Sequence, residues 1–222
     1  MPLPTPPSVR VVLYVDGFNL YHGLRDTGLQ RYYWLDIRAL GQNLLKTNQT
    51  LSLAKYFTAH ISGPRPGDTS QRARELDAKR KRQSDYLEAL KTLPDFQMFY
   101  GHYLVKSVQC RQCRATWEKS EEKMTDVNIA VELILDAHDD RFDTALVVSG
   151  DSDQVPPVRA IRARFPHKRI VVAFPPGRHS VDLGRAAHGY FTIGRDVLSK
   201  SQFPDRVVKP GGYVLQRPAR PR

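Results

Sequence analysis

A buried strand that ends in an acidic turn is predicted by Val9-Arg10-Val11-Val12-Leu13-Tyr14-Val15-Asp16-Gly17-Phe18-Asn19. Val11 to Val15 are apolar with no polar alternation, a pattern typical of a parallel strand that is covered on both faces. Gly17 permits a sharp backbone turn, which lets Asn19 face the same side as Asp16. Open α/β sheets form their ligand crevice at the carboxyl ends of such strands, so we expect both polar side chains to face that crevice.

Similar apolar runs alternate with helical patterns along the rest of the chain. Further strands are predicted over residues 51–58, 96–103, 144–149, 169–174 and 190–193. Helices are predicted over residues 35–45 and 126–138, and from Pro156 to about residue 165. This alternation predicts an α/β fold, with a central, mostly parallel sheet of about five to six strands and helices on both faces.

The composition limits the class of protein. The 222 residues suffice for one large domain, which we place at 9–196, after a flexible N-terminus at 1–8 and before a basic, proline-containing tail at 197–222. Lys and Arg number 34 against 23 Asp and Glu, and the net charge of +11 indicates a polyanionic partner or an anionic membrane surface. No apolar run approaches the ~20 residues of a membrane span, and no secretory signal is evident. We therefore expect a cytoplasmic protein without a membrane partner, and the sequence leaves open a homo-oligomer or a regulatory protein partner.

Three further acids, in two separate stretches, join Asp16. The sequence Ser149-Gly150-Asp151-Ser152-Asp153 follows the strand predicted at 144–149, and Asp126 begins a helix on the stripe that faces the sheet. Two carboxylates ~4 Å apart repel each other by roughly 4 kcal/mol at an effective dielectric near 20. Gathering three or four therefore requires raised pKa values or a bound dication, and oxygen ligands favour Mg²⁺ or Mn²⁺. Taken singly, Asp16 could be only a turn former, and Asp126 a residue favoured by the helix dipole.

Such a metal centre, surrounded by positive charge, suits the hydrolysis of a phosphodiester. The hydroxyls of Ser149 and Ser152, with the N–H groups of the helix start beside them, suit a phosphate. Residues 71–91 form a highly charged helical segment, and a second basic run lies on and after the helix that follows Asp153. The basic residues that we single out on these two segments as contacts for RNA are Arg80, Arg82, Arg159 and Arg162. Solvated outer helix faces are the alternative.

Aromatic residues and a cysteine pair complete the candidates. Phe18, Tyr21 and Trp34 lie near the first strand, where they either stack on unpaired bases or belong to the core. Cys110 and Cys113 occur as Cys-Arg-Gln-Cys in a basic stretch that we expect to be a loop over 106–121. This spacing suits half of a zinc site, to which His102 could add a third ligand. A redox pair and two reduced cysteines in a loop are the alternatives.

Three separated stretches together resemble the NYN domain family of PIN-like ribonucleases. The first stretch is Tyr14-Val15-Asp16-Gly17-Phe18-Asn19-Leu20, which resembles the aspartate and asparagine of the first motif. The second is Glu122-Lys123-Met124-Thr125-Asp126-Val127-Asn128-Ile129-Ala130, and the third is Val148-Ser149-Gly150-Asp151-Ser152-Asp153. The resemblance covers roughly residues 9–196. It implies a Rossmann-like, PIN-type three-layer α/β/α fold and Mg²⁺- or Mn²⁺-dependent cleavage of RNA.

The resemblance also implies roles for individual residues. Its metal ligands would be Asp16, Asp126, Asp151 and Asp153. Asn19 would assist them in catalysis, while Ser149, Ser152 and Lys123 would contact phosphate or orient the carboxylates. The chain departs from the family pattern at Met124-Thr125, where Gly-Val is common, and at Gln154, where an apolar residue is common.

We therefore expect a metal-dependent ribonuclease, with endonucleolytic cleavage as the favoured mode. The alternative is a catalytically inactive RNA-binding or regulatory module of the same fold.

Overall fold

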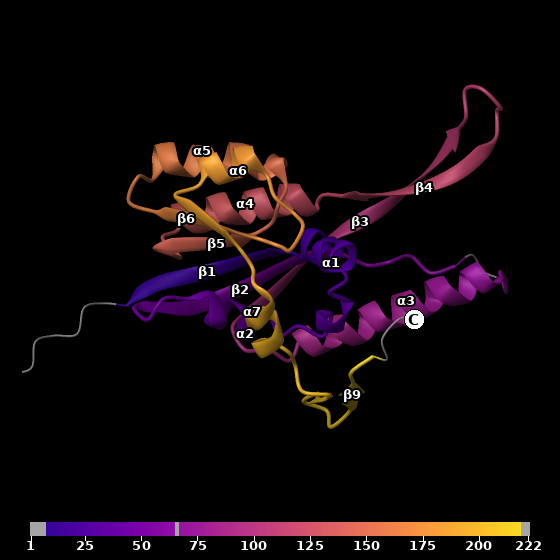
Figure 1. Ribbon diagram of the computed structural model, residues 1–222, viewed down its shortest axis with the longest axis horizontal. Helices are drawn as coiled ribbons and strands as arrows, with labels where there is room; N and C mark the ends of the chain where they lie inside the picture. The colour runs from indigo at the N-terminus through magenta and orange to yellow at the C-terminus, as the bar shows by residue number, and fades with distance from the viewer. Residues whose placement is uncertain (1–7, 65–66, 219–222) are drawn as a thin grey trace, which may run out of the picture.

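A computed structural model describes residues 8–64 and 67–218, so the first seven residues of the predicted flexible N-terminus lie outside it. A seven-stranded sheet crosses the molecule (Figure 1), in the order β4-β3-β2-β1-β5-β6-β7. All neighbouring strands are parallel except β3 and β4. The strands are β1 (Val9–Asp16), β2 (Gln49–Ala59), β3 (Phe96–Gln109), β4 (Thr116–Lys123), β5 (Thr144–Val148), β6 (Arg169–Phe174) and β7 (Gly189–Thr192).

Helices cover both faces of this sheet, as the alternating pattern predicted. The helices on one face are α4 (Thr125–His138), α5 (Val155–Arg164) and α6 (Val181–Ala186). Those on the other are α1 (Gly17–Asp26), α2 (Ile37–Leu44), α3 (Gln71–Leu90) and α7 (Arg195–Lys200). A hydrophobic core lies on each face of the sheet, and alternate residues of β1 contribute to one or the other. Leu13 packs on the side of α1 and Tyr14 on the side of α4. The fold is therefore a three-layer α/β/α sandwich.

The strand order reverses at β1, which lies between β2 and β5. From β1 the chain continues outward to β2 and β3, and it later returns to β5 on the opposite side. Connections from adjacent strands therefore leave in opposite directions, and a crevice opens at the carboxyl ends of β1 and β5. Asp16 ends β1 and Ser149 follows β5, so the topology brings these two residues together.

A buried group of charged side chains attaches α4 to the sheet. The side chain of Lys55 on β2 is only 4% exposed, and its Nζ lies 2.7 Å from Glu132 Oε2 and 2.6 Å from Asp136 Oδ2. The Tyr14 hydroxyl donates to Asp136 Oδ2 at 2.5 Å. Buried charges are tolerated when they are paired in this way. Because Glu132 and Asp136 belong to α4, these contacts set the position of that helix over β1 and β2.

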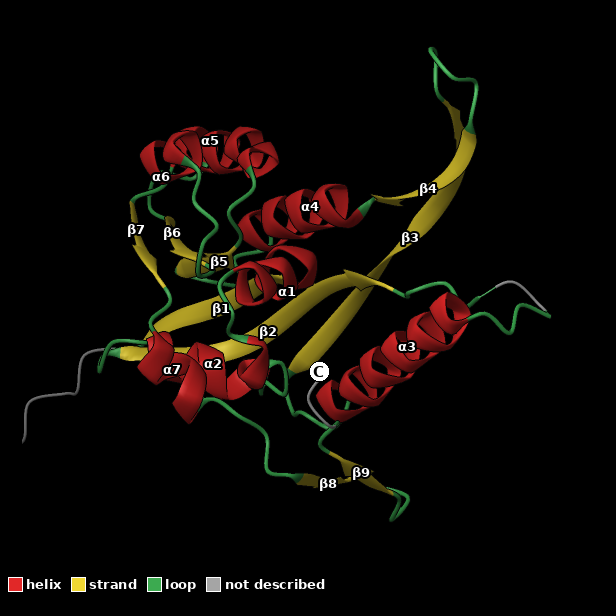
Figure 2. Ribbon diagram, turned by 45° about the vertical axis from the view of Figure 1, so that its right-hand side comes forward, coloured by secondary structure: helices red, strands yellow, loops and turns green. Residues whose placement is uncertain are grey.

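Two expectations about the ends of the sheet were wrong. The sheet has seven strands rather than five to six, and residues 106–121 form most of a β-hairpin rather than a loop. β3 continues to Gln109 and pairs with β4, so that only 110–115 form the turn. The hairpin projects from the body of the protein (Figure 2). Pattern reasoning missed β4 because its sequence is polar, and no described β4 residue joins either core.

The basic, proline-containing C-terminal tail forms regular structure as far as it is described. It contains a small hairpin of β8 (Arg206–Val208) and β9 (Val214–Gln216). Val207 and Leu215 are buried in the core on the side of α1, and Lys209 forms an ion pair with Glu88 of α3. A pattern of alternating buried and exposed residues cannot be detected from the sequence when each strand has only three residues. Among the described helices, none has the length and apolar character needed to cross a bilayer.

Replacement of Lys55 tests whether the buried charges hold α4 in place. Lys55→Met leaves Glu132 and Asp136 without their cation, and we expect the free energy of unfolding to fall by about 3–5 kcal/mol in urea denaturation. Lys55→Met with Asp136→Asn should recover part of this loss, because one uncompensated charge is removed. Lys81→Met is the matched control, since Lys81 pairs with Asp85 on the exposed surface. A loss for Lys55→Met no larger than that of the control would contradict this role.

Candidate active site

Asp16 occupies the centre of the crevice and is 3% exposed. One carboxylate oxygen accepts the backbone N–H of Asn19 at 2.9 Å, which makes Asp16 the N-cap of α1. The other accepts the hydroxyl of Ser149 at 3.0 Å. Burial raises the pKa of Asp16 to about 7, although these two hydrogen bonds act to lower it. The nearby charges of Asp126 and Glu122 add to the increase. Asp16 is thus a carboxyl group that can gain or lose a proton near neutral pH.

Gly17 allows Asp16 to sit this deep. A Cβ atom at position 17 would lie 2.5 Å from the ring of Tyr56 and 2.8 Å from the carbonyl oxygen of Phe57. Both neighbours belong to β2, which is paired with β1 and β3 at these residues and cannot shift without disturbing the sheet. The close approach of α1 to β2 therefore requires glycine at this position.

The loop after β5 is tied to the start of α1 by two contacts. The Ser149 hydroxyl, which donates to Asp16, accepts the backbone N–H of Asp151 at 3.1 Å. The side-chain oxygen of Asn19 accepts the backbone N–H of Gly150 at 3.2 Å. Ser149 is therefore hydrogen-bonded to the carboxylate of Asp16, while Asn19 holds the loop that carries Asp151.

Asp126 lies in the first turn of α4 and is partly buried. The N-cap of this helix is Met124, which adopts the left-handed conformation with φ 77°, and Thr125 donates its hydroxyl to Glu122. The helix begins at Thr125 itself, so Thr125 is its first residue and not its N-cap. Burial raises the pKa of Asp126, and the charges of Asp151 and Asp153 raise it further. Asp126 therefore lies within electrostatic reach of both acids of the third motif.

The one-turn helix Ser152–Gln154 completes the acidic group. Asp151 caps it by accepting the backbone N–H of Asp153 at 2.9 Å, while the side chains of Ser152 and Asp153 are exposed. Gln154 is fully buried and donates its amide to Asp126 Oδ1 at 3.4 Å. Its own Oε1 is buried without a protein partner among the described residues. This residue, which departs from the family pattern, links the third motif to the second.

Four aspartates lie at the carboxyl edge of the sheet, where the charge of Asp126 acts on Asp16 and the charges of Asp151 and Asp153 act on Asp126. They are not gathered into a finished ligand cage. Within residues 8–64 and 67–218, no three His, Cys, Asp or Glu side chains are arranged to hold a metal ion as they stand. The donor set consists of carboxylates, and the free Oε1 of Gln154 adds a neutral oxygen beside Asp126. This chemistry suits a hard cation that keeps several waters, such as Mg²⁺ or Mn²⁺.

Sequence reasoning gave no role to two further residues of the crevice. Glu122 ends up beside Asp126 because β4 leads directly into α4; burial and the charge of Asp126 raise its pKa. Arg178 follows β6 and lies against Gly150, and it donates to Asp26 at 2.5 Å. Glu122 could have been noticed from its place in the second motif. Arg178 could have been noticed because it follows the carboxyl end of a predicted strand.

Several other predicted contacts lie away from the acids or are already engaged. Lys123 is exposed and its Nζ lies 3.2 Å from Glu121 Oε2. Arg162 donates to the backbone carbonyls of Ala186 and Ala187, where α6 ends, which gives it a structural contact. Arg159 is exposed on α5.

The two arginines predicted on α3 differ in their surroundings. Arg80 is paired with Asp77 at 2.9 Å. Arg82, by contrast, lines a cavity between α1 and α3, and Phe18, Tyr21 and Trp34 line the same cavity. Trp34 is core as well, since it is 3% exposed.

The cysteine pair forms no zinc site with the residues described. Cys110 and Cys113 are free thiols in the turn of the β3–β4 hairpin, and no third ligand joins them there. His102 lies eight residues before Cys110 along an extended strand, which separates the two by about 26 Å. Backbone N–H groups of Cys113 and Gln112 hold the pKa of the Cys110 thiol below its usual range.

Comparisons with known proteins agree with the motifs. Residues 10–194 match the sequence profile of the NYN domain. The 6-hydroxy-3-succinoylpyridine 3-monooxygenase HspA of Pseudomonas putida is 30% identical over 217 residues, which cover 81% of this chain and 65% of HspA. This chain therefore spans just under two thirds of the length of that relative.

A solved structure shares the fold. The protein of unknown function VPA0982 from Vibrio parahaemolyticus matches with a TM-score of 0.53 at 21% identity, covering 87% of this chain and 98% of that chain. At this identity the likeness concerns the fold alone. With the profile matched across all three motifs, the chain belongs to the NYN domain family, whose fold is PIN-like and whose members are generally nucleases that act on RNA.

Proposed function

We propose that this protein is a metal-dependent endoribonuclease that hydrolyses RNA phosphodiester bonds. One observation carries the proposal: four aspartates from three distant stretches lie at one edge of the sheet. There burial raises the pKa values of Asp16 and Asp126, the charge of Asp126 adds to the increase at Asp16, and the charges of Asp151 and Asp153 add to that at Asp126. Such a concentration of negative charge costs stability unless a cation neutralises it. The net charge of +11 then supports a polyanionic substrate rather than a neutral one.

The residues of the crevice have separable tasks in this proposal. Asp16, Asp126 and Asp151 would hold Mg²⁺ or Mn²⁺, with Asp153 at the exposed rim. The bound ion would lower the pKa of a water molecule and neutralise charge on the phosphate. Ser149 and Asn19 fix the carboxylate of Asp16 and the loop after β5. Arg178, Asn19 and Ser152 line a polar hollow beside Asp151 that suits a phosphate oxygen.

Conservative variants test this assignment. We expect Asp126→Asn and Asp151→Asn each to reduce cleavage of a fluorescent single-stranded RNA in Mn²⁺ by more than about a hundredfold, because each removes a charged ligand. RNA binding should persist, and EDTA should abolish cleavage by the wild-type protein. Asp139→Asn is the matched control, an exposed aspartate about 20 Å away beyond the other end of α4.

Full activity in Asp126→Asn and Asp151→Asn would refute the proposed centre. Binding of RNA by the wild-type protein without any cleavage, in both Mg²⁺ and Mn²⁺, would instead identify the chain as a binding module of the same fold.

The pKa of Asp16 predicts a pH dependence of stability. The folded-state pKa of about 7 lies above the unfolded value of about 4, so ionising Asp16 destabilises the fold. This loss of stability is absent below about pH 4 and reaches its full value above pH 7. In EDTA, we expect the free energy of unfolding to fall by about 2 kcal/mol between pH 5.5 and pH 8. Asp126, whose pKa is also raised, contributes in the same direction.

Urea unfolding at the two pH values measures this effect. Asp16→Asn should remove most of the pH dependence, and Mn²⁺ should stabilise the wild-type protein more at pH 8 than at pH 5.5, because it binds the ionised carboxylates. Stability that rises from pH 5.5 to pH 8 in EDTA would contradict the raised pKa.

A second candidate function rests on the relative named as a monooxygenase. HspA is named for a substituted pyridine, and this chain has a cavity lined by aromatic side chains next to the acidic crevice. A monooxygenase consumes O₂ and two electrons from a reductant. Oxygen uptake with 6-hydroxy-3-succinoylpyridine and NADH, absent when either is omitted, would favour this function. No uptake, together with RNA cleavage, would reject it.

A further inference from the structure

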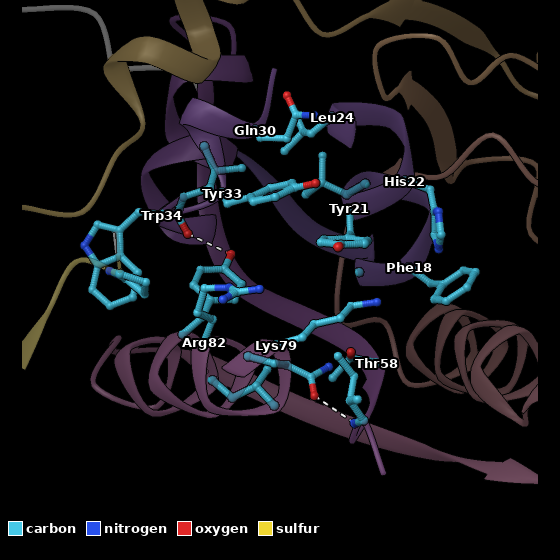
Figure 3. Close-up of a pocket in the computed structure, with 18 of the residues that line it drawn as sticks. Phe18, Tyr21, His22, Leu24, Gln30, Tyr33, Trp34, Thr58, Lys79 and Arg82 are labelled. Atoms are coloured by element: carbon cyan, nitrogen blue, oxygen red, sulfur yellow. Dashed lines mark hydrogen bonds between the residues drawn. The ribbon is translucent and has the colours of Figure 1, made fainter. Parts of the chain in front are cut away.

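A cavity of about 180 Å³ lies between α1, β2 and α3, on the far side of α1 from the loop after β5. Tyrosine rings dominate its wall. Tyr21 of α1 stacks on Tyr33, with ring centroids 4.9 Å apart, and Tyr56 and Tyr103 line the same space. Figure 3 shows Phe18 and His22 on one side of this cavity and Trp34 on the other. The cavity therefore presents several aromatic faces to whatever enters it.

The charged residues of the wall are all cations. Lys79 and Arg82 reach into the cavity from α3 (Figure 3), and the Lys79 ammonium lies 5.5 Å from the centre of the Tyr21 ring. No described Asp or Glu lines the cavity. On the same helix Arg80 and Lys81 are occupied by ion pairs with Asp77 and Asp85, whereas no ion pair to a described residue engages Lys79 or Arg82. The cavity thus keeps positive charge available for an anionic ligand.

Two other polar side chains of the wall are already engaged. The Tyr86 hydroxyl donates to the carbonyl oxygen of Leu35 at 2.8 Å. Gln83 donates to the carbonyl oxygen of Ala59 and accepts the N–H of Ile61. The side chains of Gln83 and Tyr86 are therefore not free for a ligand, whereas the tyrosine rings, Lys79 and Arg82 are available for its recognition.

The size of the cavity limits the ligand to about one ring. A cavity of ~150 Å³ in another protein holds benzene, and the present volume is only slightly larger. A planar ring with polar edges fits better than a branched or extended molecule, since stacking on tyrosine requires a flat face.

The cavity adjoins the acidic crevice. Gly17 and Phe18, which line it, directly follow Asp16, and the ring of Tyr56 lies against Gly17. Burial raises the pKa of Tyr56 above its usual range, and the charges of Asp16 and Glu122 raise it further, which places both acids near this end of the cavity. A chain that crosses the crevice would therefore reach the aromatic wall first and the basic side chains of α3 next.

We propose that this cavity is the subsite for one unpaired nucleobase of the RNA, packed against the tyrosine rings of its wall, with the adjoining phosphate at Lys79 and Arg82. The proposal rests on the proposed function, because it takes the ligand of the crevice to be RNA. It also restricts the substrate: a base can enter the cavity only if it is not paired, so single-stranded RNA is bound and duplex RNA is not.

The experiment compares two strands that differ only in their bases. A fluorescein-labelled RNA octamer without secondary structure and an abasic ribose-phosphate strand of the same length are titrated with protein in EDTA, which prevents cleavage. Fluorescence anisotropy reports both affinities. Stacking of one base contributes about 1–3 kcal/mol, so the wild-type protein should prefer the octamer by about 5-fold to 150-fold.

The variants separate the cavity from general electrostatic attraction. Tyr21→Leu and Arg82→Ala should each reduce the preference for the octamer to below about threefold, because Arg82 reaches the adjoining phosphate only when a base occupies the cavity. Tyr21→Leu should leave the affinity for the abasic strand unchanged. Tyr213→Leu and Arg74→Ala are matched controls, because neither residue lines the cavity. Arg74→Ala should weaken both strands equally, as loss of a phosphate contact does. Unchanged thermal midpoints show that the variants are folded.

Three results would overturn the subsite. They are equal affinity of the wild-type protein for both strands, a preference that survives in Tyr21→Leu and Arg82→Ala, and a preference for duplex RNA. Binding of pyridine-3-carboxylate that requires Tyr21, in a protein whose RNA affinity does not, would assign the cavity to a small aromatic acid instead.

Failure of the proposed function is distinguishable from failure of the subsite. Base preference without any cleavage in Mn²⁺ keeps the subsite and rejects the nuclease. Cleavage that is insensitive to Tyr21→Leu keeps the nuclease and rejects the subsite.

Discussion

The buried carboxylate of Asp16 is the constraint on which the crevice depends. A charged group with almost no exposure is tolerated only if the protein supplies hydrogen bonds, and here they come from the Asn19 N–H and the Ser149 hydroxyl. These two contacts join the end of β1 to the start of α1 and to the loop after β5. One side chain therefore caps a helix, links two parallel strands and presents a carboxyl group whose pKa lies near 7. A group with these properties is suited to proton transfer or to cation binding at neutral pH.

A second set of buried charges supports the first from a distance. Lys55 holds Glu132 and Asp136 of α4 over β1 and β2, and the same helix carries Asp126 at its first turn. The same helix therefore carries a candidate catalytic acid in its first turn and, further along, two acids whose role is to attach the helix to the sheet. Gln154 then connects Asp126 to the third motif by its amide. The acids are consequently held by different parts of the framework, which explains why they form an electrostatic group without forming a closed ligand cage.

Charge is distributed unevenly around this group. The acids occupy the carboxyl edge of the sheet, whereas α3 carries a cluster of Lys and Arg beyond the aromatic cavity. In that arrangement the cavity lies between a negative centre and a positive helix. A polyanion would be attracted by the helix and would be repelled by the acids until a cation neutralised them. Positive surface and acidic crevice are therefore complementary parts of the proposed function rather than competing features.

The strands at the centre of the sheet, the alternation with helices and the three acidic motifs were determined by the sequence itself, because buried parallel strands leave continuous apolar runs and strand-end acids follow them directly. β4 and the C-terminal hairpin left no such run, since an exposed edge and three-residue strands need few apolar residues. Only the tertiary structure decided that Gln154 contacts Asp126, that Arg162 contacts the end of α6 rather than solvent, and that Tyr21 and Arg82 share a cavity. These contacts join residues that are 28, 24 and 61 positions apart along the chain. Which residues meet in these contacts depends on how whole helices pack against the sheet and one another, and local patterns of apolar and polar residues do not encode that packing.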